Sequence, residues 1–258
     1  METHVSVTDE VEAARPDISV YWVPSCSSCI KAKEFVASLG EPFESLNVLE
    51  HPEALAELAA AGIRGAPAVR KGDRIAYAQS LDDLAAFLGV TRVAQRLPRG
   101  VLVARWHALQ DKAREVTASF PEKELEGHEL AGPHANVLEL AEHAFQVVES
   151  FLRLIEDDTI DARAIYLCPD KSIRSMAALL NYIDRVRAEY ANWLNGGGPS
   201  SIQARLNTHY GIQPADIVVE RYVWHMAQHA RQLDHLAGTS RIPTALYEGL
   251  PLPEGLWT

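Results

Sequence analysis

The chain has little cysteine, fewer basic than acidic residues, and no long apolar run. Three cysteines in 258 residues are too few for a disulfide-stapled scaffold. The net charge of -11 makes the phosphate backbone of a nucleic acid an unfavourable partner. No apolar run approaches the ~20 residues that a membrane-spanning helix needs. The first ten residues are acidic and polar and do not follow the signal-peptide pattern. We therefore expect a cytoplasmic protein, with no membrane partner and mostly reduced thiols.

Two of the cysteines, Cys26 and Cys29, form a Cys-x-x-Cys motif between a β-branched run at 18–23 and an amphipathic helical pattern. The free N–H groups at a helix start favour negative charge, so they lower the pKa of the first thiol. The second thiol lies one turn further on and can resolve a mixed disulfide. This layout predicts reversible dithiol–disulfide chemistry. Half of a zinc site, completed by histidines, is the alternative.

The third cysteine, Cys168, has no second cysteine near it in the sequence. We interpret it as a loop or packing thiol, and a role as a redox partner stays open. His128, His209 and His235 are interpreted as surface or helix-end groups.

The region around the motif predicts the element order βαβαββα in fewer than ninety residues. Gly40 and Gly62 follow the first two helical patterns, as helix-terminating glycines do. Ser80 is placed to cap a last helix, with Asp83 inside its first turn. The predicted elements are strand 18–23, a helix that starts at the cysteine pair and runs through Ile30 to Leu39, strand 43–48, helix 52–61, a hairpin around 71–73 that leads to strand 74–77, and a helix from about 81.

These motifs resemble the thioredoxin superfamily, and its glutaredoxin branch most closely, over about residues 17–90. The resemblance implies that Cys26 attacks and Cys29 resolves. It also implies a cis-proline site at Ala66-Pro67 that faces Cys26 and offers backbone to a thiol substrate. Ser27-Ser28 stands where glutaredoxins commonly carry Pro-Tyr, which leaves the identity of the small thiol open.

Beyond residue 98 the apolar residues recur at spacings of three and four, which predicts four long amphipathic helices in a bundle. Pro121 ends the first helix, Pro133 opens the second, and Pro214 opens the fourth, which runs to about Ala237. The third runs from about Ile173 to Leu194. The predicted organisation is a flexible tail at 1–17, an α/β domain at 18–91, a linker at 92–98, an all-α bundle at 99–238 and an extended strap at 239–258.

The fourth predicted helix carries His225 and His229 four residues apart, on the stripe that faces the bundle core. A buried unpaired imidazole is costly, and a metal ion satisfies several at once. His143 in the second helix is the preferred third ligand, although His134 projects nearer the centre of that helix's stripe. Core histidines bonded to backbone are the alternative.

This pattern resembles the DinB-like family of metal-binding four-helix proteins over residues 98 to about 238. The runs that carry the resemblance are Leu138–His143 and Glu220–Leu233. The resemblance implies that His143, His225 and His229 bind a divalent metal. We expect zinc on grounds of availability, although nickel and iron also accept three imidazoles.

The DinB-like family includes metal-dependent enzymes that use low-molecular-weight thiols. The resemblance therefore implies a two-domain thiol enzyme with such a thiol as cosubstrate and a small thiol or disulfide as substrate. A non-enzymatic redox- or metal-responsive binding protein is the second hypothesis. Handling of soft metals or organometals is the third. The sequence predicts no oligomeric state.

Overall fold

Strand β1 (Ile18–Trp22) lies inside a four-stranded sheet of order β2-β1-β3-β4. The computed structural model describes residues 15–127, 130, 134–157, 159, 161–166 and 169–256. Strand β2 (Phe43–Asn47) pairs parallel with β1, β3 (Ala68–Lys71) pairs antiparallel with β1, and β4 (Arg74–Tyr77) pairs antiparallel with β3. The helices between the strands are α1 (Ser27–Ser38), α2 (Pro52–Ala60) and α3 (Leu81–Leu88). The predicted order βαβαββα is confirmed.

Alternate residues of β1 serve two separate cores, because successive side chains of a strand point to opposite faces. Val20 packs with Val36 of α1 and Leu84 of α3 on one face of the sheet. Tyr21 packs with Leu58 of α2 on the other. Helices therefore cover both faces, as in the thioredoxin fold.

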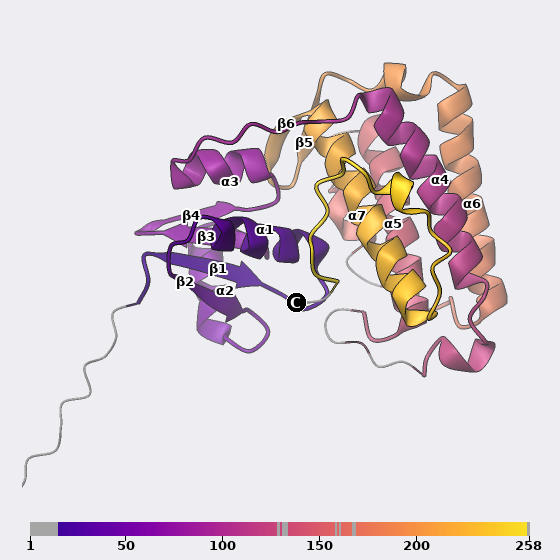
Figure 1. Ribbon diagram of the computed structural model, residues 1–258, viewed down its shortest axis with the longest axis horizontal. Helices are drawn as coiled ribbons and strands as arrows, with labels where there is room; N and C mark the ends of the chain where they lie inside the picture. Colours follow the sequence, from indigo (N-terminus) through magenta and orange to yellow (C-terminus); the bar gives the residue numbers. More distant parts are fainter. Residues whose placement is uncertain are drawn as a thin grey trace, which may run out of the picture.

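The second domain is built from four long helices, α4 (Arg99–Thr117), α5 (Val137–Glu156), α6 (Met176–Asn195) and α7 (Ala215–Leu236). Helix α7 packs against α4 and α5, and α6 packs against α5. Trp106 lies at the centre of the core, with its ring against those of Phe151, Tyr190 and Tyr222. Short 3-10 turns lie at Glu122–Glu124, Ala162–Tyr166, Gly198–Ser201 and Thr244–Leu246. The predicted architecture, an α/β domain followed by a bundle of four helices, is confirmed (Figure 1).

Two helix starts differ from the predictions. Helix α5 begins at Val137, because Asn136 caps it by accepting a hydrogen bond from the backbone N–H of Glu139. His134 therefore precedes the helix and is not in its first turn. Helix α6 likewise begins at Met176, where the Ser175 hydroxyl accepts from the backbone N–H of Ala178. In both places a side-chain cap, and not the apolar period, decides where the helix begins.

A β-hairpin between α6 and α7 was not part of the predicted fold. Strands β5 (Arg205–Thr208) and β6 (Gly211–Pro214) pair antiparallel and lead directly into α7. The Gln213 amide donates to Asp83 Oδ2 of α3 at 2.8 Å, so the hairpin contacts the α/β domain. His209 lies at its tip.

Several residues named in the sequence analysis lie outside the described residues, namely residues 1–14, His128, Pro133 and Cys168.

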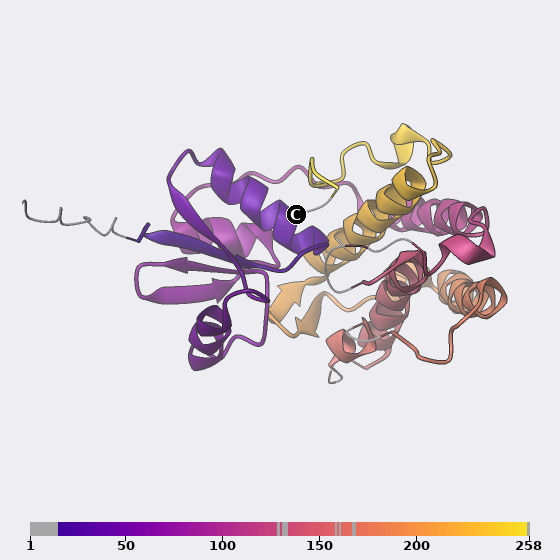
Figure 2. The same cartoon turned by 90° about the horizontal axis from the view of Figure 1, so that it is seen from below.

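The two domains meet along α7 and the C-terminal segment, near one end of α1 (Figure 2). Residues 91–98 form no helix or strand and connect α3 to α4. Within them, Arg96 Nε lies 3.2 Å from Glu220 Oε2 of α7. Among the described residues, no helix is long and apolar enough to cross a bilayer.

The predicted C-terminal strap runs, over its described part, between α1 and α7. Lys31 of α1 donates to the carbonyl of Leu252, and Glu34 accepts from the backbone N–H of Glu254. On the other side, the Gln232 amide of α7 donates to the carbonyl of Leu256. The segment is therefore bonded to both domains.

Candidate thiol and metal site

Cys26 is the N-cap of α1, and its Sγ lies 3.2 Å from the backbone N–H of Cys29, which donates to it. The two residues form a disulfide, with their Cα atoms 5.1 Å apart. Cys26 is half-buried, whereas Cys29 is fully buried. A substrate can therefore reach Cys26 Sγ from solvent but not Cys29 Sγ. The predicted roles of attacking and resolving cysteine remain predictions, and this asymmetry favours them.

The Ala66–Pro67 peptide bond is cis, as the resemblance implied. Ala66 lies in the wall of a cavity beside Cys26, whereas Pro67 is buried behind it. The amide of Gln79 donates to the carbonyl of Ala66 at 3.4 Å. The backbone that would bind a thiol substrate is thus presented next to the disulfide.

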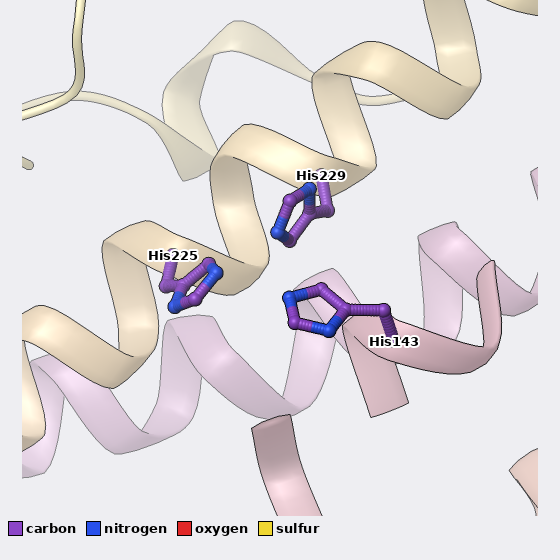
Figure 3. A group of neighbouring side chains, drawn as sticks. All are labelled: His143, His225 and His229. Atoms are coloured by element: carbon purple, nitrogen blue, oxygen red, sulfur yellow. The ribbon is translucent and has the colours of Figure 1, made fainter. Parts of the chain in front are cut away.

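The three predicted histidines come together between α5 and α7 (Figure 3). One ring nitrogen each of His143, His225 and His229 lies within 4.8 Å of the others. All three side chains are buried, and their rings point toward one another in Figure 3. The spacing of four in α7 places two of them on one helix face, and α5 supplies the third from the opposite side.

The buried nitrogens of this cluster fit a metal ion. Among the described residues, His225 Nδ1 and His229 Nε2 are buried without a hydrogen-bond partner. The other nitrogen of His229, Nδ1, lies 2.6 Å from Gln232 Oε1, which fixes that ring's orientation. Burial lowers the pKa of His229 to about 4, and burial and the neighbouring His229 lower the pKa of His225. Neutral imidazoles with unused nitrogens are the donor set that a divalent metal takes. The cluster is therefore compatible with a divalent metal.

His134 lies beside the cluster, although it is not in the helix. Its ring centroid is 4.1 Å from that of His143 and 6.0 Å from that of His229. Burial, and to a lesser extent His229, lower its pKa to about 3. The three-nitrogen grouping contains His143 and not His134, which favours His143 as the third ligand.

Cys26 and the histidines line the same cavity, which has a volume of about 290 Å³. Cys26, Ser27 and Ser28 line it from the α/β domain, together with Ala66 and Gln79. His134, His143, His225 and His229 line it from the second domain. The apolar side chains of Val23, Val48, Leu49 and Leu55 complete the wall on the α2 side. One small molecule in this space can therefore contact both the disulfide and the imidazoles.

Three further residues of the cavity wall were missed by sequence reasoning. His209, interpreted as a surface or helix-end group, is half-buried in the wall at the tip of the unpredicted hairpin. Gln79 directly precedes the helix cap Ser80. Arg221 lies four residues before His225, and this spacing is the one signal that could have placed it at the site.

The fold and the site together define a protein with a dithiol α/β domain joined to a helical bundle that carries a three-histidine cluster. Residues 103–233, slightly more than half of the chain, match the model of the DinB superfamily, to which this chain therefore belongs. Residues 18–75 match the model of the Glutaredoxin family. No curated protein matches the chain. A glutaredoxin-like domain with a cysteine pair and a DinB domain with a histidine cluster fit thiol redox chemistry and metal binding.

Proposed function

We propose that this protein is a thiol enzyme that exchanges electrons between a low-molecular-weight thiol and a small disulfide or thiol adduct. The observation that carries the proposal is the shared cavity, lined by Cys26 and by the three histidines. Two sites that served unrelated substrates would have no reason to open into one space. A cytoplasmic location, where thiols are kept reduced, suits this activity.

The thiol pair supplies the electrons in this scheme. The Cys26 thiolate attacks one sulfur of the substrate disulfide, and the other substrate sulfur leaves as a thiolate. Cys29 then loses its proton and attacks Cys26 Sγ, which releases the second substrate thiol and forms the Cys26–Cys29 disulfide. Two molecules of the low-molecular-weight thiol reduce that disulfide and leave as their own disulfide, so electrons balance over the cycle.

The bundle would hold the small thiol. A divalent ion at the three imidazoles, zinc on grounds of availability or else nickel or iron, would favour the deprotonated form of a thiol at neutral pH. The protein itself orients the imidazole rings, as Gln232 does for His229. The walls from both domains would hold the small thiol and the substrate in one cavity.

Disulfide turnover tests the thiol chemistry. Cys26→Ser should abolish turnover of a small disulfide, because the reachable sulfur is gone. Cys29→Ser should instead accumulate a mixed disulfide on Cys26, visible by mass spectrometry, while Cys168→Ser serves as a matched control with normal turnover. A Cys26→Ser variant that still turns over would overturn the proposal. Tight binding of a small thiol without any turnover would favour the non-enzymatic binding protein.

Elemental analysis of protein purified without chelator tests the metal site. His225→Ala and His229→Ala should each remove most of the metal, and His134→Ala should retain it. Cys26→Ser should also keep its metal, since that residue belongs to the other domain. Metal loss in His134→Ala but not in His143→Ala would mean that His134 is the third ligand. A wild-type protein that neither contains nor takes up metal would reduce the cluster to core histidines.

A further inference from the structure

We infer that Arg221 selects substrates that carry a carboxylate beside their sulfur, an inference that rests on the proposed thiol activity. Arg221 is 5% exposed and lines the cavity that Cys26 and the histidines share. It therefore lies where a bound small molecule would meet it.

Arg221 belongs to one row of α7 side chains along the cavity wall. Arg221, His225 and His229 follow one another at intervals of four residues, so they share a helix face. At the other end, Arg221 Nη2 lies 3.3 Å from Ser28 Oγ, and Ser28 directly precedes Cys29. Arg221 thus lies between the thiol pair and the histidine cluster, within reach of a molecule that contacts both.

The charges around the cavity favour an anion, although the whole chain is acidic. Among the described residues that line it, none is Asp or Glu, and Arg221 is the one Lys or Arg. The chain carries 35 acidic residues and a net charge of -11, so this lining differs sharply from the rest of the molecule. An anionic substrate would therefore meet the opposite charge of Arg221 inside the cavity.

Neutral groups hold the guanidinium in a fixed orientation. Its Nε and Nη2 donate to Gln79 Oε1 at 3.1 and 2.6 Å, and its Cζ atom lies 5.5 Å from the ring centroid of Tyr210. Gln79 and Ser28 are uncharged, and their hydrogen bonds with Arg221 orient its guanidinium. A planar guanidinium matches the two oxygens of a carboxylate, and a single arginine matches its single charge.

Three small disulfides of similar size and different charge test the inference on the full chain. Dithiodipropionate carries carboxylates, hydroxyethyl disulfide is neutral, and cystamine carries ammonium groups. The rate at which the reduced protein reacts with each is divided by the rate of free dithiothreitol at the same pH and salt. The wild-type protein should prefer the anionic disulfide to the neutral one and the neutral one to cystamine.

Arg221→Gln should lower the ratio of the anionic to the neutral rate by roughly tenfold, since a nearby buried charge is removed. The neutral rate of the same variant serves as the reference for this ratio, and Arg221→Lys should recover part of the preference. Arg231→Gln is the matched control, because Arg231 is also on α7 but donates to the carbonyl of Pro253 outside the cavity. Its ratio should equal that of wild type.

The outcomes separate this inference from the proposed function. Equal normalised rates for the three disulfides in the wild-type protein would overturn the role of Arg221 while the thiol activity stands. An equal loss for all three in Arg221→Gln would also overturn it, because it would show a structural role only. No reaction with any of them would overturn the proposed function itself.

Discussion

His229 shows how burial sets the charge of a single side chain and, through it, the acid stability of the protein. Its pKa is about 4 in the folded chain, against ~6.5 in an unfolded one. Between these values the unfolded chain binds more protons than the folded chain, so the free energy of unfolding decreases as the pH falls. The loss is on the order of 3 kcal/mol for His229 alone and is complete below its folded pKa. The lowered pKa of His225 acts in the same direction.

Urea unfolding of metal-free protein measures this effect. The free energy of unfolding should fall between about pH 6.5 and about pH 4, and His229→Gln should show a smaller fall over the same window. Equal pH dependence in the two proteins would contradict the assignment of the loss to His229.

The residues of the candidate site could be predicted from the sequence where two of them lie only three or four positions apart. Cys26 and Cys29 are three residues apart at a helix start, and His225 and His229 are four apart on one face, so local geometry alone places each pair. His209 could not be found in this way, because it comes to the cavity only through a hairpin and the packing of two domains.

At the scale of elements, the start of α5 depends on one side chain. Asn136 Oδ1 accepts from the backbone N–H of Glu139 at 3.0 Å and satisfies one of the free donors of the first turn. Asn136→Ala should lower the free energy of unfolding by about 1 kcal/mol, whereas Asn136→Asp should lower it less. Urea denaturation checks both variants. A wild-type stability in Asn136→Ala would mean that another residue caps α5.

The same element shows why the predicted fold was correct in order but not in its boundaries. Apolar periodicity predicts that a helix passes through Val137 and Leu140, and it does. The spacing of the apolar residues does not indicate at which residue the helix begins. That residue is set by the side chain that caps the helix, here Asn136. The β5–β6 hairpin was missed for a different reason: its strands are four residues each, too short for an alternating pattern to stand out.

At the scale of the whole molecule, the bundle lies across the approach to Cys26. Because the disulfide opens into a cavity of about 290 Å³ that the bundle helps to form, we expect the full chain to reduce hydroxyethyl disulfide but not the interchain disulfides of folded insulin. Precipitation of reduced insulin chains, measured by turbidity, checks this. Insulin reduction at a rate comparable to that of the small disulfide would show that the domains separate in solution.

The C-terminal segment also bears on which molecules can reach Cys26. Its backbone is bonded to Glu34 and Lys31 on one domain and to Gln232 on the other, so it ties the two halves of the cavity together at the end of the chain. We expect a dithiol that opens into this cavity to react with small thiols and not with large proteins that exchange electrons by docking. The ratio of dithiol to disulfide at Cys26 and Cys29 would then follow the ratio of reduced to oxidised small thiols around the protein, and not the oxidation state of other proteins.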